Sequence, residues 1–200
     1  MSMNRLLGTV PTELGLLSGL YYIALSFNNL TGIIPTELGL LTGLSQLTLR
    51  VNQLEGPIPT ELGLLSNLAY TLNLRQNQLT GTIPTEFGLL TGLSELELAD
   101  NSLTGQIPSE LGRITSMGFF SFANNSFSGS VPRELFSLHV SLHTLSLEDN
   151  PLLSGIIPTA ICEMNATCTS NTYNSCESPY GFSFNCTSLL CGCGCNLCIP

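Results

Sequence analysis

Apolar residues recur along most of the chain in one pattern with a long, regular period. Residues 44–65 read L-x-x-L-x-L-x-x-N-x-L-x-G-x-I-P-x-x-L-G-x-L, and the chain repeats this pattern about six times. The asparagine of the pattern returns after 24 or 25 residues each time. The positions are Asn28, Asn52, Asn77, Asn101, Asn125 and Asn150. Such a period is typical of stacked units, each of which buries its apolar side against its neighbours.

Each repeat divides into a strand, an asparagine turn and a return segment. The x-L-x-L-x part predicts a β-strand with one apolar and one solvent-facing side. The predicted strands are 23–25, 47–49, 72–74, 96–98, 120–122 and 145–147. Each asparagine amide carries two donors and an acceptor, so we expect it to bond its own loop and the next one. The asparagines then form a structural ladder along the stack.

The return segment, L-T-G-x-I-P-T-E-L-G-L-L, bends at its glycine and continues from its proline into a short helical turn. Thr36, Thr60, Thr85 and Ser109 are the expected N-caps, with a glutamate following each in the first turn. We expect the leucines that follow to fill the core.

This glycine-isoleucine-proline form resembles the plant-type leucine-rich repeat of receptor-like ectodomains and pectinase-inhibitor proteins. The T-E-L-G-L-L-T motif also resembles that of receptor-like repeat proteins of algal lineages. The resemblance covers residues 4 to about 161. It implies an α/β solenoid, a right-handed superhelix with a parallel β-sheet on the concave face and short helical or 3-10 turns on the convex face. It also implies a second short sheet at L-x-G-x-I-P.

The repeats contain no cysteine, and all eight cysteines lie in the tail. They are Cys162, Cys168, Cys176, Cys186, Cys191, Cys193, Cys195 and Cys198. We therefore divide the chain into a solenoid at residues 1–161, with an incomplete first repeat, and a disulfide-stapled cap at residues 162–200. The pairing of the cysteines stays open. The C-x-C-x-C-x-x-C run at 191–198 also allows a zinc site or thiol redox chemistry. The lack of a nearby histidine and of a βαβ context favours disulfides.

Four N-x-S/T sequons agree with an oxidising, glycosylating compartment. Their asparagines are Asn29, Asn124, Asn165 and Asn185. We expect the protein to be extracellular or at the cell surface. No run of eighteen or more apolar residues is present, so membrane attachment would require segments outside this chain. Residues 14–26 imitate a signal sequence but stay in repeat register, and the chain opens in mid-repeat, as expected of a fragment.

Charge restricts the partners. The chain has fourteen acidic residues, five arginines and no lysine, with a net charge of −9. This balance argues against nucleic acid and against anionic lipid, both of which need a basic surface.

The solvent-facing strand positions are the candidate binding residues. We call these positions, with the two residues before each ladder asparagine, the strand face. Its residue types change from repeat to repeat, whereas other columns keep one type. Because the core does not dictate these choices, variation here indicates recognition, although a neutral solvated sheet is the alternative. The candidate residues are Tyr22, Phe27, Arg50, Arg75, Glu95, Glu97, Asp100 and Phe119.

Other constellations are weaker. His139 and His143 are four residues apart, as metal ligands on a helix would be, but they lie where a loop enters the last strand. A column of glutamates could bind calcium, but glutamate is also favoured at the start of a helical turn. The column consists of Glu13, Glu37, Glu61, Glu86, Glu110 and Glu134. No nucleophile–base pair, phosphate loop or kinase signature is present, so we expect no enzymatic activity, cofactor or metal.

The expected function is recognition of a peptide, a glycan or a partner protein on the concave face of a receptor-like protein. The alternatives are a secreted inhibitor of the pectinase-inhibitor type and an ice or cell-wall surface protein that uses convex hydroxyl groups.

Overall fold

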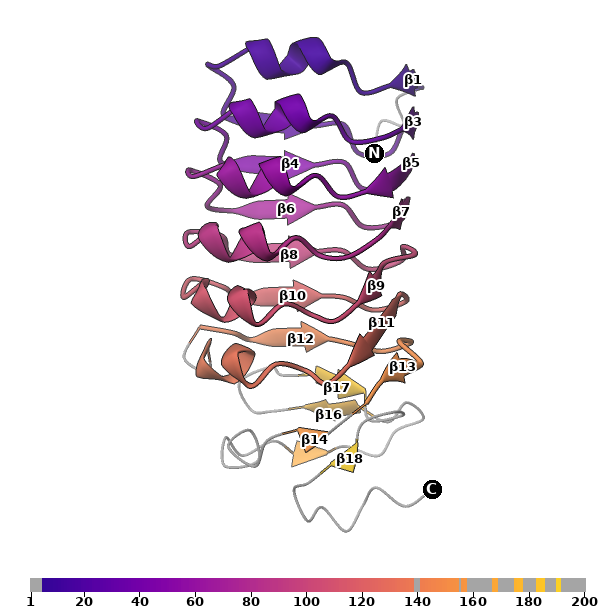
Figure 1. Cartoon of the computed structure of the whole chain (residues 1–200), viewed down its shortest axis with the longest axis vertical. Helices are drawn as coiled ribbons and strands as arrows, with labels where there is room; N and C mark the ends of the chain where they lie inside the picture. The colour runs from indigo at the N-terminus through magenta and orange to yellow at the C-terminus, as the bar shows by residue number, and fades with distance from the viewer. Residues whose placement is uncertain are drawn as a thin grey trace.

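The protein is a stack of similar coils, each with one main strand, one 3-10 turn and a short second strand (Figure 1). The computed structural model describes residues 5–138 and 141–154, and beyond them the backbone of five short strands. In Figure 1 the 3-10 turns lie in front of the main sheet, and the second strands form the right-hand edge.

The main sheet is parallel and six-stranded, in the order β12-β10-β8-β6-β4-β2. Its strands are β2 (Tyr22–Ala24), β4 (Gln46–Thr48), β6 (Thr71–Asn73), β8 (Glu95–Glu97), β10 (Phe119–Ser121) and β12 (Thr144–Ser146). Each strand starts and ends one residue before the predicted span. Hydrogen bonding nevertheless continues beyond the strand, since the Leu25 amide donates to the Thr48 carbonyl at 2.9 Å.

The second strands form the additional sheets that the resemblance implied. A four-stranded parallel sheet contains β1 (Leu7–Thr9), β3 (Asn29–Gly32), β5 (Gln53–Pro57) and β7 (Gln78–Thr80). A three-stranded sheet contains β9 (Thr104–Gly105), β11 (Ser126–Gly129) and β13 (Leu152–Leu153). Glycine stands at the bend because the backbone there is left-handed, as at Gly56 with φ 74°.

The return segments form 3-10 turns. They are η1 (Thr12–Leu16), η2 (Thr36–Leu40), η3 (Thr60–Leu64), η4 (Thr85–Leu89), η5 (Ser109–Arg113) and η6 (Arg133–Leu138). The predicted N-caps Thr36, Thr60, Thr85 and Ser109 are wrong by one position. In η2 the extended Pro35 is the cap, and no side chain bonds the turn. Thr36 already lies inside the turn, so its hydroxyl donates to the Glu37 carboxylate at 3.3 Å instead.

The core lies between the main sheet and the turns. Leu38 and Leu41 are fully buried in it, but Leu40 is 60% exposed, so only part of the L-G-L-L run fills the core. In a 3-10 helix residues three apart lie on one side, which sends Leu38 and Leu41 inward and Leu40 outward. At β10 the core is aromatic, with the ring centroids of Phe120 and Phe122 5.1 Å apart.

The described backbone of the tail changes from parallel to mostly antiparallel pairing. β14 (Ile156–Ile157) pairs in parallel with β18 (Leu190–Cys191). β15 (Thr167–Cys168), β16 (Ser175–Glu177) and β17 (Ser183–Asn185) form an antiparallel sheet. The proposed boundary at residue 162 stays a prediction. Within the part of the chain that the structure describes, no helix is both long and apolar enough to cross a lipid bilayer.

Candidate ligand-binding face

The register of the main sheet aligns the outward strand positions in two rows. The first row runs through Tyr22, Gln46, Thr71, Glu95, Phe119 and Thr144. The second row runs through Ala24, Thr48, Asn73, Glu97, Ser121 and Ser146. Adjacent parallel strands lie about 4.8 Å apart. Side chains from repeats 24 or 25 residues apart are therefore direct neighbours.

A further row follows each strand, in a left-handed backbone conformation. Its residues are Phe27, Val51, Gln76, Asp100, Asn124 and Asp149, with φ between 52° and 58°. This conformation costs about 1–3 kcal/mol for a residue such as Val51 or Phe27. The stack maintains it through hydrogen bonds between repeats, including the Phe27 amide to the Arg50 carbonyl at 3.0 Å. The side chains of Phe27 and Asp100 are thus presented from a rigid turn.

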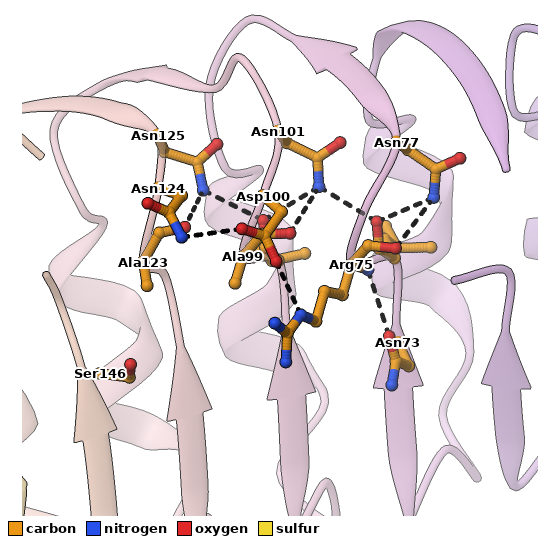
Figure 2. Close-up of polar contacts among 12 residues, drawn as sticks. Asn73, Arg75, Asn77, Ala99, Asp100, Asn101, Ala123, Asn124, Asn125 and Ser146 are labelled. Carbon is orange, nitrogen blue, oxygen red and sulfur yellow. Dashed lines mark hydrogen bonds and ion pairs between the residues drawn. The ribbon is translucent and has the colours of Figure 1, made fainter. Parts of the chain in front are cut away.

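The asparagine column lies directly beside this row (Figure 2). Asn101 accepts a hydrogen bond from the Leu79 amide at 3.1 Å through Oδ1. Its Nδ2 donates to Leu98 and Ala99 in its own repeat and to the Leu74 carbonyl of the preceding repeat at 3.1 Å. The bonds between repeats therefore run from each asparagine to the preceding repeat, and not to the next one as predicted. Equivalent bonds are made by Asn52, Asn77, Asn125 and Asn150. Asn28 accepts from the Leu6 amide of the preceding repeat, and its Nδ2 donates within its own repeat.

Glu95 and Glu97 form an acidic centre on β8. Burial raises the pKa of Glu97, the negative charge of Glu95 raises it further, and Arg50 and Arg75 partly oppose the shift. Glu95 accepts a hydrogen bond from the Thr71 hydroxyl at 2.5 Å. Among the described residues, neither glutamate forms a salt bridge. The centre of the face therefore holds negative charge with no direct cationic partner.

Both arginines of the face are engaged elsewhere. Arg75 Nε donates to Asp100 Oδ2 at 2.8 Å, and Asn124 Nδ2 donates to Asp100 Oδ1 at 2.8 Å (Figure 2). The Arg50 guanidinium lies 4.6 Å from the centroid of the Phe27 ring, a cation–π contact. The structure thus brings together two pairs of predicted residues, Arg75 with Asp100 and Arg50 with Phe27.

The two other aromatic candidates are not part of these pairs. Tyr22 lies at the N-terminal edge of the main sheet and is 46% exposed. Phe119 is half-buried and stands opposite Glu95 on the neighbouring strand. An apolar surface therefore adjoins the acidic centre on the side of β10.

Three polar residues belong to the strand face but are not among the eight candidate binding residues chosen from the sequence. Thr71, Asn73 and Ser121 point outward from the sheet, yet they are only 5–6% exposed. They surround the acidic centre, because Asn73 and Ser121 are the register partners of Glu97 and Thr71 is that of Glu95. The repeat period alone aligns each of these polar residues with a charged residue of a neighbouring repeat, so the sequence contained the information needed to find them.

Comparisons with known proteins agree with this architecture. The family model described as Leucine Rich Repeat matches residues 19–41, 70–90, 92–114 and 141–164. The ectodomain of the receptor kinase SOBIR1 from Arabidopsis thaliana is 34% identical with a TM-score of 0.60, over 64% of this chain and 69% of that one. The chain belongs to the leucine-rich repeat family. A search of the curated proteins finds no match.

Two longer leucine-rich repeat ectodomains are also similar. That of the Arabidopsis thaliana receptor kinase GASSHO1/SCHENGEN3, in complex with CASPARIAN STRIP INTEGRITY FACTOR 2, is 42% identical with a TM-score of 0.73. The match covers 81% of this chain and 19% of that one. The plant peptide hormone receptor RGFR1, in complex with RGF2, is 38% identical with a TM-score of 0.67, over 79% and 29%. This chain therefore spans less than a third of either protein.

The modification sites predicted for this leucine-rich repeat chain are only partly within the described residues. Asn29 is exposed at the start of β3, and Asn124 is exposed but bonds Asp100. Asn185 lies in β17, and Asn165 lies outside the described residues. Of the cysteines, Cys168 and Cys176 are antiparallel register partners and Cys191 ends β18. Cys162, Cys186, Cys193, Cys195 and Cys198 lie outside the described residues, so glycosylation and disulfide formation stay predictions.

The remaining metal candidates do not come together in the described part of the chain. His143 is exposed, and His139 lies outside the described residues. Within the described ranges, no three His, Cys, Asp or Glu residues cluster as metal ligands would.

The convex hydroxyl groups at the start of the turns, which suggested an ice or cell-wall surface, already form hydrogen bonds within the protein. These residues are Thr12, Thr36, Thr60, Thr85 and Ser109. The first hydroxyl of each of η1 to η5 donates to the adjacent glutamate at 3.2–3.4 Å.

Proposed function

We propose that this chain is a non-catalytic recognition module of an extracellular or cell-surface receptor-like protein, and that it binds a peptide along the strand face. The observation that carries the proposal is the acidic centre of Glu95 and Glu97. A half-buried carboxylate with a raised pKa and no salt bridge is unfavourable in the free protein. A ligand cation beside Glu97 would offset that cost, which favours a positively charged group in the ligand.

The surrounding residues define the rest of the ligand. Arg75 pairs with Asp100 and Arg50 lies over Phe27, so neither arginine neutralises Glu97 through a salt bridge. Phe119 offers an apolar contact next to Glu95. The ligand we expect is an extended peptide with a lysine, an arginine or an amino terminus at the acidic centre, and with an apolar residue on the side of β10.

The similar ectodomains support a peptide rather than a glycan. RGFR1 is a peptide hormone receptor in complex with RGF2. Because this chain covers only 29% of that protein, the support extends to the type of ligand and not to its identity.

A peptide-display selection against the full chain tests the proposal. We expect the selected peptides to share a basic residue. Their affinity should fall by about tenfold or more for the double variant Glu95→Gln/Glu97→Gln, since about 1.4 kcal/mol of lost ion pairing gives that factor. Glu55→Gln is the matched control, because Glu55 is exposed on β5, away from the strand face.

The outcome against the proposal is equally definite. Selected peptides that bind the double variant as tightly as the native chain would exclude Glu95 and Glu97 from the site. Circular dichroism and unfolding of the double variant would separate lost binding from lost folding.

A further inference from the structure

A second surface of the molecule carries exposed leucines in a regular column. Leu16, Leu40, Leu64 and Leu89 end successive turns η1 to η4 and are 76%, 60%, 55% and 58% exposed. We call these four residues the leucine stripe. Single exposed leucines are common on soluble proteins, whereas an adjoining row of them indicates a contact surface.

The fold does not require leucine at these positions. The equivalent residue is Arg113 in η5 and Ser137 in η6, and both turns form with the same stacking contacts. The core is filled by other positions, such as the fully buried Leu38, Leu41 and Leu62. The leucines of the stripe therefore add little to folding.

The turns beneath the stripe are packed against one another through glycine. A Cβ added at Gly39 would lie 2.4 Å from the Glu61 carbonyl oxygen, and one at Gly15 would lie 2.4 Å from that of Glu37. The turns cannot separate or tilt without losing this contact. The strands of successive coils lie about 4.8 Å apart, so at that spacing the four leucines, one per coil, form a row roughly 14 Å long.

A column of glutamates borders the stripe. In a 3-10 turn residues three apart are eclipsed, so Glu37 and Leu40 lie on the same side, roughly 6 Å apart along the turn axis. Glu13, Glu61 and Glu86 occupy the same position in their turns. Within the described residues, none of these four glutamates forms a salt bridge. The stripe is thus an apolar row with a negative border.

We propose that the leucine stripe docks an amphipathic α-helix whose apolar ridge is bordered by lysine or arginine. The pitch of an α-helix, about 5.4 Å, nearly matches the spacing of the coils, so three helical turns can follow the four leucines. An extended strand repeats its facing side chains only every 6.6 Å or so and soon falls out of step. The basic border of the helix complements the glutamate column. Anionic lipid and a second copy of this acidic chain would both meet like charge.

A direct test uses a synthetic Leu/Lys peptide of about 18 residues, long enough to be helical, and the full chain. Fluorescence anisotropy should show binding that weakens as salt is added. Leu40→Ser/Leu64→Ser should weaken binding by about tenfold or more, and this variant should fold because Ser137 occupies the same position in η6. Ile33→Ser is the matched control, because Ile33 and Leu40 are both 60% exposed.

Other arms of the experiment separate the alternatives. If Glu95→Gln/Glu97→Gln loses the Leu/Lys peptide while Leu40→Ser/Leu64→Ser keeps it, the peptide lies on the strand face and the proposal is overturned. Equal binding of a Leu/Glu peptide would remove the role of the glutamate border. Capture of the native chain by phosphatidylcholine–phosphatidylglycerol vesicles would assign the stripe to lipid instead. Self-association that Leu40→Ser/Leu64→Ser abolishes, without peptide binding, would assign it to a second copy.

Discussion

The strand face and the turn face are built from the same repeat, yet they use side chains in opposite ways. On the strand face one row reads Gln, Thr, Glu, Phe and Thr from β4 to β12. On the turn face, the outward side of η1 to η6, glutamate recurs in every turn and leucine in four of them. A varied surface can distinguish one ligand from another, whereas a periodic surface can only match a partner that is itself periodic, such as a helix.

Packing explains why the two faces differ. The turns touch through glycine and the glutamate backbone, so substitutions at these positions alter the stack itself. The outward strand side chains touch mainly one another, as Arg75 touches Asp100, and they can change without moving the backbone. The asparagine column lies beside the strand face and joins successive coils through hydrogen bonds. Substitutions in these three places should therefore separate the faces.

Loss of a ladder asparagine should have the largest effect and should disturb both faces. Asn125 is buried and bonds the Leu103 amide at 2.9 Å, as well as the carbonyls of Leu98, Phe122 and Ala123. Asn125→Ala leaves the buried Leu103 amide without a partner and removes one of the hydrogen bonds that each of the three carbonyls accepts. We expect unfolding in urea to show a loss of about 3 kcal/mol. Asn67→Ala, which removes one exposed bond to the Thr42 carbonyl, is the control. Equal losses for the two variants would contradict the ladder.

Crowding of the turn stack should come second and should act on the turn face. In Gly39→Ala the new methyl would meet the Glu61 backbone at 2.4 Å, and we expect a loss of about 2 kcal/mol in thermal or urea unfolding. Gly43→Ala is the matched control, because its nearest neighbour is 3.6 Å away. If the two alanines cost the same, the close contact between the turns does not exist in solution.

The period, the core and the sheet could be predicted because burial imposes them at every repeat. Leu47 and Leu72 are fully buried register partners, and their spacing alone implied a parallel stack. The turns were predicted less well. Capping preferences describe α-helices, and here Pro35 ends an extended segment immediately before a 3-10 turn. The difference between three and 3.6 residues per turn also decides that Leu40 faces water and Leu41 faces the core.

The chemistry of the strand face was only partly predictable. The sequence placed Arg75 and Glu97 on one face through strand alternation, and Asp100 through its position immediately before Asn101. It could not show that Arg75 pairs with Asp100 and leaves Glu97 without a salt bridge. The pairing of Arg75 with Asp100 depends on the left-handed backbone conformation of Asp100. Val51 and Gln76 adopt the same conformation, so the residue type at this position does not reveal it.

The Arg75–Asp100 pair should have a smaller effect, confined to the strand face. The side chains are 43% and 26% exposed, so solvent screens much of their attraction. A double-mutant cycle with Arg75→Gln and Asp100→Asn should give a coupling free energy of about 0.5–1 kcal/mol in urea unfolding. A coupling near zero would mean that Arg75 is free to contact a ligand directly.

The smallest change in stability should come from substitution of Glu97, and it should have the opposite sign to the losses expected for the ladder and the turn stack. Because burial, with Glu95, raises its pKa in the folded state, the ionised side chain opposes folding. Native stability should therefore fall as the pH rises from the ordinary glutamate pKa through the raised one. Glu97→Gln removes this titration, so the variant should be more stable than the native chain at pH near 7, with the difference shrinking in acid. Urea unfolding at both pH values, with Glu55→Gln as control, measures it. If Glu97→Gln is less stable than the native chain at neutral pH, the carboxylate supports the fold. If the variant is more stable, the native Glu97 lowers the stability of the folded protein, as we expect of a residue retained for ligand binding.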